Sequence, residues 1–555
     1  MILTAFAELI GVASIMPFMA VAATPDLIST NSYLNAAYVF LGEPGVNIFL
    51  IYIGLVFIFL IFLSNGLLLV SQFLMNRYAH RLGGEFSANV YAYYLNKNIL
   101  FHNRKNSADL TQHIMRDTLR ISTHLVAPAL RLNGRVFSIV LLSLLIIYVD
   151  VYVAFSTLFC LVLVYSFVFY ALRSRIYTNG QHISGFNATR NKLLNESFEG
   201  LKDIKLYRAE SQLIKQFTAL TRKVSRALAE NMILGQSPYY LVETVMLIGI
   251  LLITLYFIVY KGGIETVLPV LTLYCMAGFK LVPKVQQSYL AITQIRSAQP
   301  VFHSLYGVLE QANRESTKHT EDVPVVRLDN SIALDDICYC YPGSSEPLLE
   351  HVSLEITVGE MIAITGRSGA GKSTLLEIIM GLIEPDSGLL RIDSMALDPG
   401  NIAGWQKAVG FVPQVVYLTD ATIAENIAFG VLPESIDMKR VRSAARQAAI
   451  ASYIEDLPEG YNTLVGERGA LLSGGQRQRL GIARALYRDV SVLVLDEATS
   501  ALDNQTQGQV FCSLRSREKT LTVIMVTHRA ETLQFANRIY EVRGGELRER
   551  TKVVD

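Results

Sequence analysis

The sequence predicts a domain of membrane-spanning α-helices followed by an α/β domain built around a P-loop. Residues 1–300 hold several long apolar runs, whereas the chain after about residue 325 has the composition of a soluble domain. The second part also contains EMIAITGRSGAGKSTLLEIIMGL, which has the order of a buried strand, a glycine loop and a helix. A chain of 555 residues is too long for one core, so at least two domains are expected.

The composition excludes some classes of function. Only 17% of the residues are charged, which is low for a soluble protein. The net charge of +1 gives no reason to expect binding to nucleic acid. The five cysteines are scattered, and Cys338 and Cys340 alternate along a predicted strand without a second pair, so no metal or redox site is expected. A reducing, cytoplasmic setting fits this pattern.

Six segments are apolar enough to cross a bilayer, which takes about 20 mainly apolar residues. They lie at 2–23, 47–75, 134–149, 151–172, 239–260 and 264–284. The third and fourth meet at the turn YVDVY. The first ends in FMAVAAT, like a secretory signal peptide, but no basic segment precedes it. We therefore interpret it as a shortened first span and expect an upstream cytoplasmic segment to be missing.

Basic residues predict the orientation of these spans. Residues 76–133 contain eight Lys or Arg and residues 173–236 contain eleven, whereas residues 24–46 contain none. The turn at 148–152 has none, and the turn at 261–263 has Lys261 alone. Because Lys and Arg concentrate on the cytoplasmic side, the two long loops and the C-terminal domain are predicted to be cytoplasmic.

Both long loops show helical spacing of apolar residues, in SADLTQHIMRDTLRI and in LLNESFEGLKDIKLYRAES. This pattern predicts membrane helices that continue into the cytoplasm, each bent at a short connecting helix. The alternative is a pair of amphipathic surface helices.

Charges inside the predicted spans are candidate functional residues, because each is costly in hydrocarbon. Lys280 and Lys284 are one turn apart, with Pro283 between them, and could line a path for an anionic head group. The alternative is that both reach a membrane boundary. Glu8 and Glu243 raise the same question, and the boundary position is favoured for Glu243, one turn inside the cytoplasmic edge.

The glycine loop predicts a phosphate-binding site. A strand at Met361–Ile364 leads into GRSGAGKST, whose backbone N–H groups and following helix would face phosphate. Lys372 would reach the β- and γ-phosphates, and Ser373 would bind Mg²⁺.

A second buried strand ends in two acids, in VSVLVLDEATSALD. With Val492–Leu495 as the strand, Asp496 would hold Mg²⁺ through water, and Glu497 would orient and polarise the attacking water. The alternative, an ordinary pair of carboxylates at a strand end, is disfavoured beside a P-loop.

The order and spacing of the motifs resemble those of the ATP-binding cassette (ABC) transporters over nearly the whole chain. The motifs are Gly366–Thr374, LSGGQ at Leu472–Gln476, VLVLDE at Val492–Glu497, SALD at Ser500–Asp503 and His528 in VTHR. The resemblance implies an exporter-type six-span α-helical transmembrane domain, fused to an α/β P-loop NTPase cassette with a RecA-like core and a helical subdomain. The expected bounds are 1–300 for the membrane domain, 301–324 for a linker and 325–555 for the cassette.

The same resemblance implies further roles. Gln414 would touch Mg²⁺, Tyr341 would stack on adenine, His528 would contact the γ-phosphate, and Asp503 would couple two sites. A strand aromatic is the alternative for Tyr341, and Thr463–Gly469 would meet the cytoplasmic loops of the membrane domain. The expected catalytic residues are Glu497, His528 and Gln414, and the expected Mg²⁺ ligands are Ser373, Gln414 and Asp496. The expected ATP-binding residues are Tyr341, Gly366, Ser368, Gly369, Gly371, Lys372, Ser373, Thr374, Ser473, Gly474, Gly475, Gln476 and Asp503.

Cassettes of this family work as head-to-tail pairs, so the resemblance implies a homodimer in which Ser473, Gly474 and Gly475 close over ATP held by the other chain. The fused order favours export. We expect ATP-driven flipping of an amphipathic anionic lipid or lipid-linked saccharide across the bilayer of a bacterial cytoplasmic (inner) membrane, with ATP and Mg²⁺ as cofactors. The alternatives are a multidrug or peptide exporter, and a membrane-anchored regulatory ATPase that transports nothing.

Overall fold

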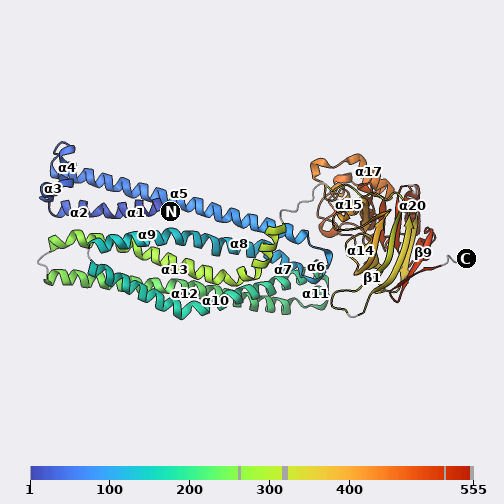
Figure 1. Ribbon diagram of the computed structural model, residues 1–555, viewed down its shortest axis with the longest axis horizontal. Coiled ribbons are helices and arrows are strands. Elements are labelled where there is room, and N and C mark those ends of the chain that lie inside the picture. Colours follow the sequence, from blue (N-terminus) through green and yellow to red (C-terminus); the bar gives the residue numbers. More distant parts are fainter. Residues whose placement is uncertain are drawn as a thin grey trace. The chain divides into compact units, whose positions relative to one another are not determined.

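The computed structural model describes residues 2–149, 151–260, 264–315, 323–344, 346–517 and 520–550 (Figure 1). Contacts divide the chain into two units. The helical unit comprises residues 1–97 and 102–318, and the sheet unit comprises residues 98–101 and 319–555.

The helical unit is a bundle of long helices that run alongside one another (Figure 1). Two short π-helical turns, His113–Asp117 and Ser122–Val126, interrupt the helix that leads into α9. Residues 2–315, which include the start of α6 assigned to the sheet unit, contain the α-helices α1 (Ile2–Ala13), α2 (Ile15–Ala23), α3 (Leu27–Thr30), α4 (Ser32–Phe40), α5 (Val46–Leu95), α6 (Ile99–Arg104), α7 (Ser107–Gln112), α8 (Thr118–Ile121), α9 (Ala127–Val149), α10 (Val151–Glu199), α11 (Leu201–Tyr207), α12 (Glu210–Tyr260) and α13 (Ile264–Glu315).

Each predicted span lies in helix. Residues 2–23 form α1 and α2, and the other five spans fall within α5, α9, α10, α12 and α13. Within the described residues, three stretches are long and apolar enough to cross a membrane: Ile2–Ala22, Val46–Leu95 and Ser107–Tyr148. The count of six spans stays a prediction. Asp150 and the turn at 261–263, which holds Lys261, lie outside the described residues.

Three of the four helices that flank the long loops extend far beyond the apolar segments, and α9 belongs to a helical stretch that begins at Ser107. The helix α5 has 50 residues, α10 has 49 and α12 has 51. The short helix α6 lies at the first bend and α11 at the second. This confirms the predicted long helices with a short connecting helix at each bend. Separate surface helices, the alternative, are not what these segments form.

Apolar side chains hold the bundle together and also cover its outer surface. Val12, Leu142 and Leu281 join α1, α9 and α13 in one buried cluster. The outward side chains of α5, among them Phe62 and Phe73, are exposed. Only 6% of the most apolar stretch of this helix is buried. Exposed apolar surface on this scale suits lipid rather than water.

The predicted linker begins in helix. Residues 301–315 continue α13, where Val301 and Leu305 pack against Ile121 of α8. Residues 316–322 lie outside the described residues. The domain bounds 1–300, 301–324 and 325–555 stay a prediction.

The described part of the sheet unit contains two sheets. One has the strand order β2-β1-β4-β5 and is antiparallel, and the other has the order β10-β9-β3-β8-β7-β6 and is parallel except for the β9–β10 pair. The strands are β1 (Ser331–Tyr339), β2 (Leu349–Thr357), β3 (Met361–Gly366), β4 (Ser387–Ile392), β5 (Met395–Ala396), β6 (Val409–Val412), β7 (Val492–Asp496), β8 (Thr522–Val526), β9 (Arg538–Arg543) and β10 (Glu546–Arg550).

The mostly parallel sheet is buried on both faces, which explains the unbroken apolar runs of its central strands. Along β7, Leu493 and Leu495 belong to one core, whereas Val492 and Val494 belong to the other. Because successive side chains of a strand point to opposite faces, each face receives every second residue. The second core contains Trp405, which is fully buried and donates its indole N–H to the carbonyl of Ile379.

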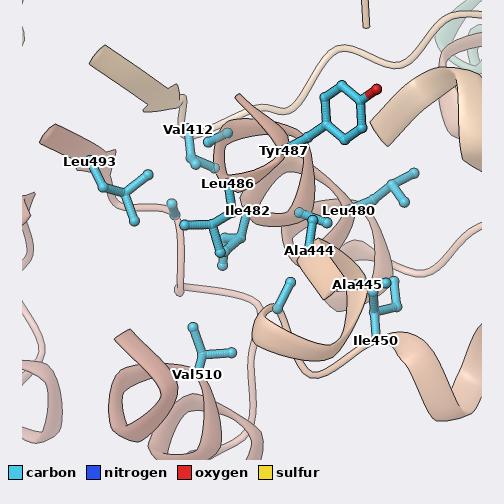
Figure 2. Close-up of a cluster of buried hydrophobic side chains, with 14 of the residues drawn as sticks. Val412, Ala444, Ala445, Ile450, Leu480, Ile482, Leu486, Tyr487, Leu493 and Val510 are labelled. Atoms are coloured by element: carbon cyan, nitrogen blue, oxygen red, sulfur yellow. The ribbon is translucent and has the colours of Figure 1, made fainter. Parts of the chain in front are cut away.

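Helices cover the first core, a cluster in which Leu480, Ile482 and Leu486 of α19 are buried together with Leu493 and Val510 (Figure 2). The division into a RecA-like core and a helical subdomain stays a prediction. The helices of this unit are α14 (Lys372–Ile379), α15 (Ile402–Ala408), α16 (Ile423–Ile427), α17 (Met438–Gln447), α18 (Ala451–Glu455), α19 (Gly474–Tyr487), α20 (Asn504–Arg515) and α21 (Ala530–Leu533).

Candidate functional site

The glycine loop connects β3 to α14 and requires glycine at its first position. Gly366 has a φ of +144°, and a Cβ atom there would lie 2.6 Å from the carbonyl oxygen of Val542. Gly369 and Gly371 also have positive φ, at +79° and +102°. These conformations are open to glycine and strained for other residues, so the loop can turn tightly before α14 begins. Ser368 and Gly369 are exposed at its tip.

Lys372 lies over this loop rather than in solvent. The residue is only 8% exposed, and its Nζ donates to the carbonyls of Gly366 at 2.7 Å and Arg367 at 2.9 Å. The next hydroxyl residues face two other groups: Ser373 Oγ donates to Asp496 Oδ2 at 3.2 Å, and Thr374 Oγ1 lies 3.0 Å from the hydroxyl of Tyr341. The loop, the ammonium group and the strand-end acid are thus brought together.

Ser373 and Asp496 together form a pair of hard oxygen donors. The pKa of Asp496 is raised, mainly because the carboxyl is partly buried; the hydrogen bond from Ser373 opposes this shift, and the charge of Glu497 adds to it. A hydroxyl next to a partly buried carboxylate is the kind of donor set that Mg²⁺ takes beside phosphate. Ser373 and Asp496 therefore fit a magnesium ion, but Gln414, the third expected ligand, does not join them.

The third expected ligand, Gln414, forms its hydrogen bond to Glu497 and not to Ser373 or Asp496. Its Nε2 donates to Oε2 of Glu497 at 2.7 Å, and His528 Nε2 lies 3.4 Å from the other oxygen, Oε1. The three residues follow β6, β7 and β8, which are neighbours in the sheet. Because the carboxyl ends of parallel strands meet at one edge, side chains distant in sequence converge there. This arrangement can hold a carboxylate between two neutral or cationic groups.

The motif LSGGQ forms the capped start of α19. Gln476 N donates to Ser473 Oγ at 3.3 Å, and Ser473 N donates to Gln476 Oε1 at 2.7 Å, which is a reciprocal capping box. A Cβ atom on Gly475 would lie 3.0 Å from the carbonyl oxygen of Ala501. The glycine therefore lets α19 approach the SALD loop closely.

Two residues outside the predicted set hold that loop in place. Gln478 donates from Nε2 to Ser500 Oγ at 3.0 Å and accepts from Ala501 N at 2.9 Å. Arg529 donates to the carbonyl of Ser500, among others. Asp503 then caps α20, and the backbone and hydroxyl of Thr506 hold the pKa of its carboxyl below the usual range. The only signal for Gln478 in the sequence was a polar residue at a position of α19 that faces the core.

The predicted site residues therefore form two groups. The first contains Tyr341, Gln414, Glu497, His528 and the residues of the glycine loop with Asp496. The second contains Ser473, Gly474, Gly475 and Gln476 with the SALD loop. Among the described interactions, the side chain of Ser473 bonds only to Gln476. Its group presents a capped helix N-terminus, and no described hydrogen bond joins the Ser473 side chain to the first group.

The charged residues of the predicted spans also differ from one another. Lys284 pairs with Glu8, with Nζ 2.6 Å from Oε2, and both side chains are largely buried. Lys280 lines the same cavity as this pair. Lys284 and Glu8 thus form a buried ion pair, and whether these residues lie at a membrane boundary stays a prediction. Glu243 accepts a long hydrogen bond from Tyr239 within its own helix.

Two family models match the chain, one for each unit. The ABC transporter transmembrane region matches residues 3–256, and the ABC transporter model matches residues 349–500. The chain belongs to the ABC transporters. The sheet unit is accordingly the cassette, a nucleotide-binding domain, and the helical unit is the membrane-embedded domain of an exporter-type half-transporter.

Proteins with similar sequences support the assignment to this family. The chain is 39% identical over 269 residues to "ABC transporter B family member 29, chloroplastic" of Arabidopsis thaliana, a match that covers 48% of this chain and 42% of the relative. It is 31% identical over 361 residues to the "ATP-dependent lipid A-core flippase" of Cupriavidus metallidurans, a match that covers 64% of this chain and 60% of the relative. It is 34% identical over 285 residues to the protein of the same name from Vibrio cholerae, a match that covers 51% of this chain and 48% of the relative. The chain thus spans about 42–60% of the length of these relatives.

A solved structure, "Structure of a bacterial Atm1-family ABC exporter with ATP bound", matches the fold with a TM-score of 0.80. The match covers 99% of this chain and 94% of that chain, at 22% sequence identity. The predicted order of an exporter-type helical domain followed by a cassette is confirmed.

Proposed function

We propose that the chain is half of a homodimeric ABC exporter that uses ATP hydrolysis to move an anionic lipid or lipid-linked saccharide across the cytoplasmic membrane of a bacterium. The observation that carries this proposal is the fusion of the cassette to a helical unit with a cavity lined by Arg131, Arg135, Lys280 and Lys284. Relatives named lipid A-core flippases support an anionic lipid as cargo.

ATP would be bound through its phosphates by the glycine loop. Lys372 would exchange its two carbonyl partners for the β- and γ-phosphates, because an ammonium group interacts more strongly with phosphate than with a neutral carbonyl. Ser373, Asp496 and Gln414 would hold Mg²⁺, which neutralises charge on the phosphates when it is bound. Gln414 would then release Glu497, to which its amide nitrogen donates, and turn its amide oxygen toward the ion.

Glu497 would orient and polarise the attacking water, since its carboxylate lies where β6, β7 and β8 converge. His528 would contact the γ-phosphate from the neighbouring strand. Asp503, at the end of the SALD loop, would link this centre to the second group of residues.

The second group would act on the partner chain. Ser473, Gly474 and Gly475 begin a helix of 14 residues, and a helix N-terminus favours phosphate through its N–H groups and its dipole. In a head-to-tail dimer each chain would supply this N-terminus to the ATP held by the other. The long loops and the cassette would lie on the cytoplasmic side, as the basic residues predict.

Reconstitution of the purified protein in liposomes tests the transport. We expect ATP to move a fluorescent phosphatidic acid or a labelled lipid-linked saccharide out of the leaflet on the cassette side, as measured by its protection from dithionite. The variant Lys372→Ala should move none. Vesicles that hydrolyse ATP but move only a hydrophobic drug or a peptide would contradict the lipid cargo, and movement of nothing would point to a regulatory ATPase.

Tyr341 gives a separate test of the nucleotide pocket. Base stacking on an aromatic ring contributes about 1–3 kcal/mol, so Tyr341→Ala should raise the Kd for ATP by roughly tenfold. Tyr341→Phe should leave the Kd unchanged although it loses the hydrogen bond to Thr374. Titration with a fluorescent ATP analogue measures both. Tyr417→Ala, which removes an exposed tyrosine of the same unit, is the control, and normal affinity in Tyr341→Ala would exclude stacking.

A further inference from the structure

A cavity of about 330 Å³ lies inside the helical unit, between α1, α5, α9 and α13. Its lining contains four cationic side chains, Arg131, Arg135, Lys280 and Lys284, and one carboxylate, Glu8. Charge of one sign in a low-dielectric space is costly unless an opposite charge enters. The cavity therefore has room for a further anion, and its excess of positive charge would stabilise one.

Glu8 is held by two donors within this cavity. Its Oε2 accepts from Lys284 Nζ at 2.6 Å and from Ser138 Oγ at 2.9 Å. The Glu8 side chain is 3% exposed and that of Lys284 is 14% exposed. Removing one partner of such a pair leaves a buried charge uncompensated, so Lys284 needs an anion at all times.

The other three cationic side chains of the cavity are not paired with a described acid as Lys284 is. Arg135 donates to the carbonyl of Gln287 at 2.8 Å, and Arg131 donates to a carbonyl of its own helix. Lys280 has no hydrogen-bonding or ion-pair partner among the residues that the structure describes. Lys280 and Lys284 are one turn apart on α13, so a single phosphate could contact both.

A second cavity of about 220 Å³ adjoins the first and shares Glu8, Phe279 and Lys280 with it. Its other lining residues are mostly apolar, including Val12, Ile61 and Met276. A charged chamber beside an apolar one suits a molecule with an anionic head and a hydrocarbon chain. Free phosphate would fill only the first chamber.

We propose that Glu8 is a built-in counter-anion, which the anionic head of the cargo displaces from Lys284. This inference rests on the proposed lipid substrate and specifies how its head group is selected. In the empty cavity, Glu8 neutralises Lys284. An incoming phosphate, which carries more charge and can also bind Lys280, takes its place. A zwitterionic or neutral head cannot compete with the carboxylate, so Glu8 excludes the bulk lipids of the membrane.

Binding of short-chain lipids to the full-length protein in detergent tests this exchange without any transport. Glu8→Gln removes the competing charge and should lower the apparent Kd for dioctanoyl phosphatidic acid by roughly 5- to 20-fold, as measured by native mass spectrometry. The Kd for dioctanoyl phosphatidylcholine should not change. Inorganic phosphate should bind more weakly than phosphatidic acid to both proteins, because it leaves the apolar chamber empty.

The gain in affinity should depend on Lys284. In a double-mutant cycle, the gain from Glu8→Gln should be several-fold smaller in a Lys284→Gln background, because the exchanged cation is gone and only the repulsion between Glu8 and the phosphate is relieved. Glu243→Gln, which neutralises an acid of the same unit outside the cavity, should leave the Kd for phosphatidic acid unchanged.

An unchanged or raised Kd in Glu8→Gln would overturn the proposal and make Glu8 a structural or ligand-supporting residue. If that variant loses its helix content by circular dichroism, Ser138→Ala decides the question. It removes only the hydroxyl that donates to Glu8, and it should lower the Kd for phosphatidic acid by about two- to fivefold. An unchanged Kd there would overturn the proposal as well. Failure of transport with normal lipid binding would count against the proposed function alone.

Discussion

Replacing Glu497 with Gln is expected to lower ATP hydrolysis by about 100-fold or more while ATP still binds. Gln has the same shape as Glu, and its amide can keep contact with Gln414 and His528. It cannot accept a proton from water, however, so the variant lacks the base that we propose for the attacking water. Release of inorganic phosphate measures hydrolysis, and a fluorescent ATP analogue measures binding.

Glu434→Gln, in an exposed turn of the same unit, is the matched control and should hydrolyse ATP normally. If Glu497→Gln kept most of the activity, the general base would have to be another group. His528 is then the next candidate, because its Nε2 is 3.4 Å from the same carboxylate. His528→Ala would distinguish the two.

The parts of the site that depend on local sequence could be predicted. The turn at Gly366, the exposed tip at Ser368 and the strand that ends at Asp496 all follow from a few adjacent residues. The cap formed by Ser473 and Gln476 also depends only on a spacing of three residues. Such features do not require knowledge of how distant segments pack.

The contact between Glu8 and Lys284 could not be predicted, because the two residues are 276 positions apart. The sequence placed Lys280 and Lys284 on one face of a helix, yet it could not show that, within the described part of the chain, Lys284 meets an acid and Lys280 does not. That difference arises from how α1 and α9 pack against α13, where Ser138 supplies the second donor. Arg131 lies just outside the predicted span 134–149, whereas Arg135 lies inside it and could have been found as a charge within a span.

The nucleotide site that we propose to be shared between two chains predicts that two inactive variants can restore each other. Lys372→Ala and Ser473→Ala should each lower ATP hydrolysis by about 100-fold or more. In a mixed dimer, one site has both defects, whereas the other combines an intact Lys372 with an intact Ser473. Half of the dimers in an equal mixture are mixed, so reassociated protein should recover up to about a quarter of the normal rate, as measured by phosphate release.

A mixture of Lys372→Ala with the double variant Lys372→Ala/Ser473→Ala contains no complete site and is the matched control, which should recover nothing. A direct measurement accompanies the kinetics: with the five native cysteines replaced, cysteines at the exposed positions Ser368 and Ser473 should form an ATP-dependent disulfide between two chains. A helix N-terminus that served its own glycine loop would give neither the recovery nor a covalent dimer on a gel. Full activity of Ser473→Ala alone would likewise show that phosphate binding is complete within one chain.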